Sequence, residues 1–177
     1  MKKYSILFSA LILFIFVPKA SAQFEFGLAA GTEYGFGLLA RVGTPTVMLE
    51  LGGGLAPQLV FWTVYGGSNS YLKFYLPATV GAKLSFSSSK SSKESRIGFK
   101  FGVSYNTILK MGFGGGVDYT WGEKMRFVIS GGAMYYPKAY DELLERLNDA
   151  EGTSYGKEDT SSVLMNFQPF VSFGIIF

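Results

Sequence analysis

The chain contains neither cysteine nor histidine. Without cysteine it can form no disulfide framework and perform no thiol chemistry, although this absence does not identify a cellular compartment. Without histidine it lacks the side chain that most often serves as general base, metal ligand or pH switch near neutrality. Ser-His-acid catalysis is therefore excluded, and we expect a protein that is not an enzyme and has no cofactor and no metal site.

Long apolar runs are also scarce. One such run, residues 6–17, follows two lysines near the start of the chain and precedes the small residues Ala20 and Ala22. A basic start, a short apolar stretch and a small-x-small site are typical of a cleaved secretory signal. We therefore predict a signal peptide over residues 1–22 and one domain over residues 23–177. No later stretch approaches the roughly 18 consecutive apolar residues of a membrane-spanning helix.

The excess of positive charge belongs to this predicted signal. The chain has 16 Lys+Arg and 13 Asp+Glu, and removal of Lys2, Lys3 and Lys19 leaves 13 bases against 13 acids. A domain with zero formal net charge gives no reason to expect nucleic acid or another anionic partner.

Aromatic and glycine residues, by contrast, are abundant and regularly spaced, with 17 Phe, 11 Tyr and 23 Gly. Between Arg96 and Asn106 large apolar residues alternate with charged, polar or small ones. The same alternation continues over residues 112–121 and 125–135. A period of two residues indicates strands with one apolar and one polar face.

This alternation predicts an all-β fold, an antiparallel β-barrel of eight strands. An even number keeps both ends of the domain on one side of a membrane. We treat residues 46–65 as one strand, because a break at Ala56-Pro57-Gln58 would give nine strands and a piece too short to span. The predicted strands are 24–31, 34–43, 46–65, 71–86, 96–107, 111–121, 125–137 and 162–177.

Three further features qualify these strands. Pro57, Pro77 and Pro169 each remove a ladder donor and should mark a bulge or lie beyond the membrane band. Residues 85–95 form a long turn on the side of the chain ends. Residues 138–161 form one long outer loop, in which apolar residues at helical spacing predict a short helix.

The apolar face can point either inward, as in a soluble lipocalin-like barrel, or outward to lipid. Side-chain volume decides between these arrangements. The charged face is rich in Gly, Ser and Ala, which suit the narrow interior of eight strands, whereas Phe, Tyr and Trp recur on the apolar face and are too bulky for it. We therefore expect a transmembrane barrel with a polar interior.

The end of the chain supports this expectation. Val171, Phe173, Ile175 and Phe177 lie on one face of an extended strand, and the chain stops on an aromatic residue. This segment resembles the C-terminal sorting strand of bacterial outer-membrane β-barrels, in which the terminal aromatic is read by the assembly machinery. The resemblance implies that Phe173, Ile175 and Phe177 form an assembly signal.

With the signal peptide, the whole domain resembles small outer-membrane β-barrels of the OmpA/OmpX-like, porin-family-like kind. The resemblance implies location in the outer membrane of a Gram-negative bacterium. The expected partners are outer-membrane lipids and lipopolysaccharide, together with the barrel insertion machinery. The resemblance carries over no catalytic motif.

Nine charged residues fall on the predicted inner face: three acids and six bases. They form either an anion-lined pathway or binding cleft, or a structural network of ion pairs. We favour the network because an eight-stranded lumen is filled by side chains. The expected function is accordingly structural or surface-interaction (binding or adhesion), with a narrow channel for small ions or solutes through a basic lumen as the alternative. The nine residues are Glu25, Arg41, Glu50, Lys73, Lys83, Arg96, Lys100, Asp118 and Arg126.

Overall fold

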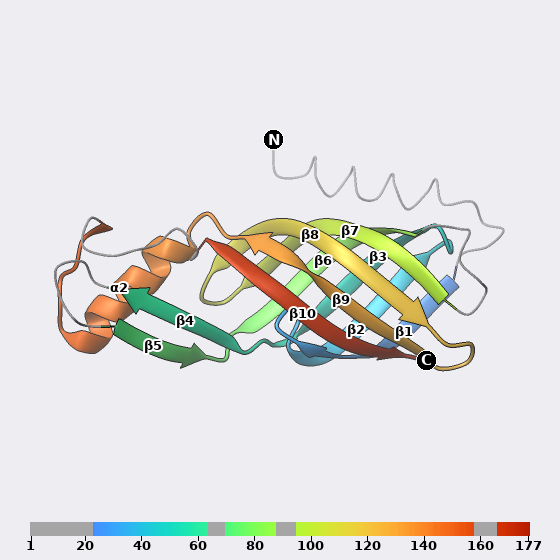
Figure 1. Cartoon of the computed structure of the whole chain (residues 1–177), viewed down its shortest axis with the longest axis horizontal. Helices are drawn as coiled ribbons and strands as arrows, with labels where there is room; N and C mark the ends of the chain where they lie inside the picture. Colours follow the sequence, from blue (N-terminus) through green and yellow to red (C-terminus); the bar gives the residue numbers. More distant parts are fainter. Residues whose placement is uncertain (1–22, 64–69, 88–94, 158–165) are drawn as a thin grey trace, which may run out of the picture.

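The protein folds as a closed barrel of eight antiparallel strands in the computed structural model (Figure 1). The structure describes residues 23–63, 70–87, 95–157 and 166–177, so the predicted signal peptide lies outside the described residues. The barrel strands are β1 (Gln23–Gly31), β2 (Phe36–Gly43), β3 (Val47–Leu55), β6 (Ala78–Ser87), β7 (Ser95–Asn106), β8 (Lys110–Trp121), β9 (Arg126–Tyr135) and β10 (Phe167–Ile176). They join in the order β1-β10-β9-β8-β7-β6-β3-β2. The predicted all-β class and the eight barrel strands are confirmed.

Each wall strand places large apolar side chains outside and polar ones inside. Phe24 on β1 and Phe36 on β2 are both 72% exposed, whereas Glu25 and Arg41 on the same strands are buried. On β7 the buried Lys100 lies between two exposed phenylalanines. This is the direction of alternation that side-chain volume predicted, because the small and charged residues fit the narrow interior.

Two of the predicted strands are wrong in extent. The segment 46–65 is interrupted at Ala56 and Pro57, and the segment 71–86 is interrupted at Leu76 and Pro77. The pieces beyond the prolines, β4 (Gln58–Thr63) and β5 (Ser70–Tyr75), pair with each other in a separate two-stranded sheet.

The physical reason is that the two prolines lie at the same height on neighbouring strands. The ladder between β3 and β6 ends with Leu55 opposite Ala78, and the ladder between β4 and β5 begins with Gln58 opposite Tyr75. Between them, Ala56 N donates to Pro77 O at 2.9 Å. Since proline supplies no N–H, neither strand continues the ladder. Both strands leave the wall together, so the barrel keeps eight strands.

The predicted helix in the loop before β10 is confirmed as α2 (Ala139–Glu151). Tyr140, Leu143, Leu144 and Leu147, the residues at helical spacing, are all buried. They belong to one apolar cluster with Val60 of β4, with Ile108 and Leu109 of the β7–β8 turn, and with residues of β9 and β10. Among the described residues, no helix has the length and apolarity to cross a membrane.

We call β4, β5 and α2 together the cap. Figure 1 shows the cap at the end of the barrel opposite the C-terminus. An ion pair joins α2 to the barrel end, since Lys110 Nζ lies 3.2 Å from Glu142. The molecule therefore has a wall with an apolar exterior, a charged interior and a small apolar cluster above one mouth.

Candidate functional site

Eight of the nine residues predicted to face the barrel interior do so. Six of them are almost completely buried, and Arg96 and Arg126 are partly exposed. Lys73 is the exception, and its predicted place was wrong. It lies on β5 in the cap, where its Nζ is 2.7 Å from Glu151 of α2 and is partly exposed. Because the proline breaks take β5 out of the wall, its polar face meets α2 instead of the interior.

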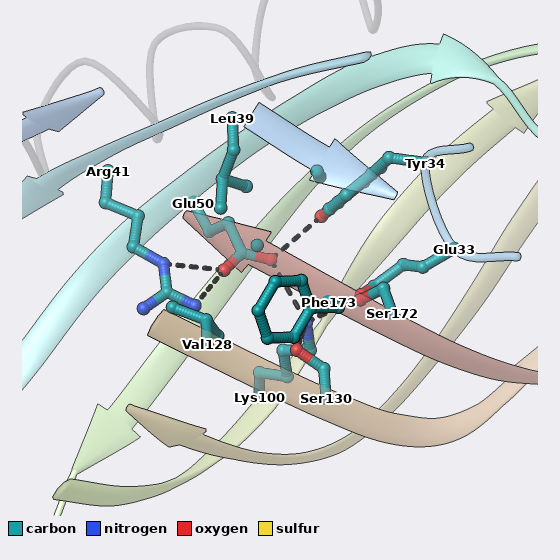
Figure 2. A pocket seen from close by; sticks show the side chains of 12 residues that line it. Glu33, Tyr34, Leu39, Arg41, Glu50, Lys100, Val128, Ser130, Ser172 and Phe173 are labelled. Carbon is teal, nitrogen blue, oxygen red and sulfur yellow. Dashed lines mark hydrogen bonds and ion pairs between the residues drawn. The ribbon is translucent and has the colours of Figure 1, made fainter. Parts of the chain in front are cut away.

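Glu50 on β3 is the centre of the interior network. The Arg41 guanidinium donates to one Glu50 oxygen from Nε at 2.8 Å and from Nη2 at 2.5 Å. The other oxygen accepts from the Tyr34 hydroxyl at 3.2 Å and from Lys100 Nζ at 3.1 Å. Figure 2 shows Arg41 and Tyr34 approaching this carboxylate from opposite sides. Both carboxylate oxygens are thus paired, which a charge with 1% exposure requires.

Arg41 also connects this centre to the opposite wall. Its Nη2 lies 3.0 Å from Asp118 of β8, and its Nη1 donates to the Thr120 hydroxyl at 3.3 Å. The planar guanidinium contacts Glu50 through two nitrogens while it reaches Asp118, and a lysine could not reproduce this two-nitrogen contact. The network therefore crosses the barrel from β2 and β3 to β8.

The second part of the network depends on Glu33, which the sequence did not predict. Glu33 is 5% exposed and accepts from Lys83 Nζ, from Lys100 Nζ at 2.8 Å and from the Ser172 hydroxyl at 2.7 Å. It lies in the turn between β1 and β2, outside any alternating segment. The one available signal was the imbalance of six bases against three acids, which calls for further buried acid.

The β1–β2 turn folds inward over the network. Gly35 has φ +71°, and a Cβ there would lie 1.7 Å from Leu55 O, so only glycine fits this close approach. The turn directs the Tyr34 ring against β3, where a Cβ on Gly52 would lie 2.5 Å from the ring. Lys83 Nζ lies 4.8 Å from the centre of the Tyr34 ring and 4.5 Å from that of Phe170. These rings cover the lysines on the cap side.

A third group of charges lies toward the chain ends. Arg126 Nη1 donates to Glu25, and Arg96 Nη2 lies 3.4 Å from the same carboxylate. Arg96 also donates to Pro45 O at 3.3 Å. Among the described residues, Glu25 Oε2 has no hydrogen-bond partner although it is buried.

The interior is nearly balanced in charge, and at the level of Glu50 it is nearly filled. With Glu33 included and Lys73 removed, the described interior has four acids and five bases. The cavity among Glu33, Tyr34, Arg41, Glu50 and Lys100 measures about 10 Å³, at most the space of one water molecule. The arrangement can hold the strands in register, but at this level it leaves no room for a hydrated ion.

Above this level, Tyr136 closes the interior beneath α2. Its hydroxyl and that of Ser104 lie 2.7 Å apart in a hydrogen bond. Burial raises the pKa of Tyr136 above its usual value, the Ser104 hydrogen bond lowers it and the charge of Glu33 raises it, for a net increase. A phenol is already neutral at physiological pH, so Tyr136 contributes a hydrogen bond and not a charge.

The residues of the predicted assembly signal lie on the outer face at the end of the barrel. Phe173 lies against Trp121 and Phe127, with ring centres 6.4 and 6.0 Å away. Ile175 is half-buried, and Phe177 is 63% exposed while its N–H donates to Phe26 O at 2.8 Å. Their role in assembly stays a prediction.

In the ranges that the structure describes, no three acidic side chains gather in a group that could hold a metal ion. Comparisons with protein-family models, with curated proteins and with solved structures found no match to this chain. The functional inference therefore rests on the wall, the interior and the cap themselves.

Proposed function

We propose that the protein is a small outer-membrane β-barrel of a Gram-negative bacterium, OmpA/OmpX-like in architecture, with a structural or surface-interaction role and no enzymatic activity. The observation that carries this proposal is the combination of an exposed apolar wall with an ion-paired, nearly filled interior. In the proposed arrangement the chain ends face the periplasm and the cap faces outward.

The wall supports a lipid environment on energetic grounds. Exposed large apolar residues occur on all eight barrel strands, including Phe24, Phe36, Phe99 and Val171. Each would forgo the roughly 1.5–3 kcal/mol that burial of such a side chain contributes. Soluble monomers rarely expose contiguous apolar patches larger than a few hundred Å². Outer-membrane lipids and lipopolysaccharide would cover this surface.

The cap supports the surface-interaction role. Among the described residues, the strands and the helix outside the barrel wall lie together at one end, where α2 makes both hydrophobic and charged contacts with the barrel rim. A nearly filled interior beneath it gives transport little support. The alternative is a narrow channel for small ions or solutes through a basic lumen, but Arg41, Lys83 and Lys100 each contact a carboxylate.

Phe177 provides the experiment that tests location. It lies at the barrel edge, and Phe177→Ser keeps its backbone hydrogen bond to Phe26 O, so the folded stability should change only modestly. If the barrel insertion machinery reads this residue, the variant should show reduced outer-membrane levels and precursor left in the periplasm. Refolding in detergent, followed by heat-dependent gel migration, should be almost unchanged.

Phe167→Ser serves as the matched control, because Phe167 is a similarly exposed aromatic at the other end of β10. It should leave outer-membrane levels near those of the unmodified protein. Recovery of the unmodified protein in the soluble periplasmic fraction would refute the proposed location. Equal loss of assembly and of refolding in Phe177→Ser would make Phe177 a structural residue.

A further inference from the structure

The hydrogen-bonded wall extends less far toward the cap at β1 and β2 than elsewhere. The pairing of β1 with β10 ends at Gly31 opposite Ser172, and that of β2 with β3 ends at Phe36 opposite Leu55. β10 extends further toward the cap, since it begins at Phe167, and β4 continues beyond the end of β3. Within the described residues β4 pairs with β5 and not with β10. The wall is therefore interrupted above the β1–β2 turn, between the start of β10 and the base of β4.

A pocket of about 390 Å³ lies at this interruption. Small-molecule sites typically measure roughly 300–1,000 Å³, so this volume is sufficient for a ligand. Two of its rim residues, Phe74 and Pro169, are exposed and belong to the outward-facing sets of β5 and β10. The pocket thus opens sideways, onto the apolar exterior. Its buried lining residues are Glu33, Gln58, Met134, Tyr136 and Phe170.

The polar groups in this lining indicate what it would bind. Gln58 is 8% exposed, and its buried Oε1 has no hydrogen-bond partner among the described residues. A buried amide oxygen without a partner costs about 1–3 kcal/mol, which a ligand hydroxyl could recover. Glu33 already accepts from Lys83, Lys100 and Ser172, so it provides no free charge for a cation.

From these observations we propose that the side pocket binds a small neutral amphiphile. Its apolar part would lie against Met134 and Phe170, and its hydroxyl would donate to Gln58 Oε1. The ligand would enter from the apolar phase around the wall, since Phe74 and Pro169 at the rim are continuous with that exterior. This inference rests on the proposed placement of the wall in lipid.

Photolabelling tests the proposal. The protein is placed in lipid nanodiscs and exposed to octanol that carries a photoreactive diazirine on its alkyl chain, and labelled peptides are mapped by mass spectrometry. The alcohol should label peptides with Met134 and Phe170 several-fold more than the outward-facing peptide around Phe99. Gln58→Leu should lower the pocket labelling about 3- to 10-fold, the effect of one hydrogen bond.

Three controls make the result decisive. Gln23→Leu, the same change at the opposite end of the barrel, should leave the labelling unchanged. A diazirine octane without hydroxyl should label the pocket weakly, and no less in Gln58→Leu than in the unmodified protein. Phe170→Trp, which fills the pocket and leaves Gln58 in place, should also reduce labelling by the alcohol.

Heat-dependent gel migration confirms that each variant is folded before labelling. A failure to enter nanodiscs at all would refute the membrane placement, a result distinct from failure of the pocket. Even labelling along the outer wall, or equal labelling of the unmodified protein and Gln58→Leu, would overturn the pocket proposal.

Discussion

Single residues inside the barrel depend on shared partners. Glu50 is contacted by Arg41, Tyr34 and Lys100, and Glu33 by two lysines and a serine. Each ion is buried, so its desolvation is offset only while those contacts are complete. A substitution at one position therefore leaves several other groups without compensation.

Arg41→Met should lower the free energy of unfolding in lipid vesicles by about 3–5 kcal/mol, because it leaves Glu50 and Asp118 buried with fewer partners. Urea titration followed by tryptophan fluorescence measures the change. Lys110→Met is the control, since the Lys110–Glu142 pair is partly exposed and should contribute about 0–1 kcal/mol. Equal effects of the two substitutions would contradict the role of the interior network.

At this scale the sequence predicts inward-facing residues wherever a strand alternates. Arg41, Lys83 and Lys100 followed from period-two spacing alone. Glu33 did not, because a turn has no periodicity and its inward direction depends on Gly35 and on contact with β3. Lys73 also had period-two spacing, but its strand, β5, lies in the cap and not in the wall.

At the scale of the elements, two prolines mark the point at which the β3–β6 ladder of the wall ends and the β4–β5 sheet of the cap begins. Pro57 and Pro77 were recognised as incompatible with a continuous ladder, yet the sequence does not reveal that they lie at the same height, one residue apart in register, on neighbouring strands. That alignment is a property of strand register. The position of α2, by contrast, followed from helical spacing, and its buried residues are those the spacing indicated.

Weaker packing of α2 should loosen the cap while the barrel stays folded. Leu143 and Leu147 are completely buried in the apolar cluster beneath α2. Leu143→Ala and Leu147→Ala should each lower the free energy that stabilises the packing of α2 by about 2–5 kcal/mol. Hydrogen exchange should then show faster exchange in α2 and unchanged protection in β7 and β8.

Glu145→Ala is the matched control, since Glu145 lies on the exposed face of the same helix. It should leave exchange in α2 nearly unchanged. Loss of protection across β7 and β8 in the leucine variants would show that the cap and the barrel unfold as one unit.

Taken as a whole, the barrel wall reverses the usual arrangement of a soluble barrel: its strands carry most of their charges inside and most of their aromatics outside. The interior is closed by ion pairs around a cavity of about 10 Å³. Closure and charge balance depend on long-range contacts, such as Arg41 with Asp118. For this reason strand patterns predict the face of each residue but not the pairing between strands.

Planar-bilayer recording should find no stable conductance steps for the unmodified protein, because no hydrated ion fits past Glu50 and Lys100. Lys100→Glu and Arg126→Glu should likewise show no stable steps. A conducting porin in the same bilayer serves as the control for incorporation. Stable anion-selective steps in the unmodified protein that disappear in both variants would support the channel alternative.

The meeting of Leu55 and Ala78 across neighbouring strands has a consequence for how this chain can vary. Everything between those two residues is, in terms of connectivity, an insertion between adjacent wall strands. Its length and sequence can change without altering the register of any barrel strand. The rim of this barrel is therefore a grafting point, at which new surface segments can be exchanged while the wall stays the same.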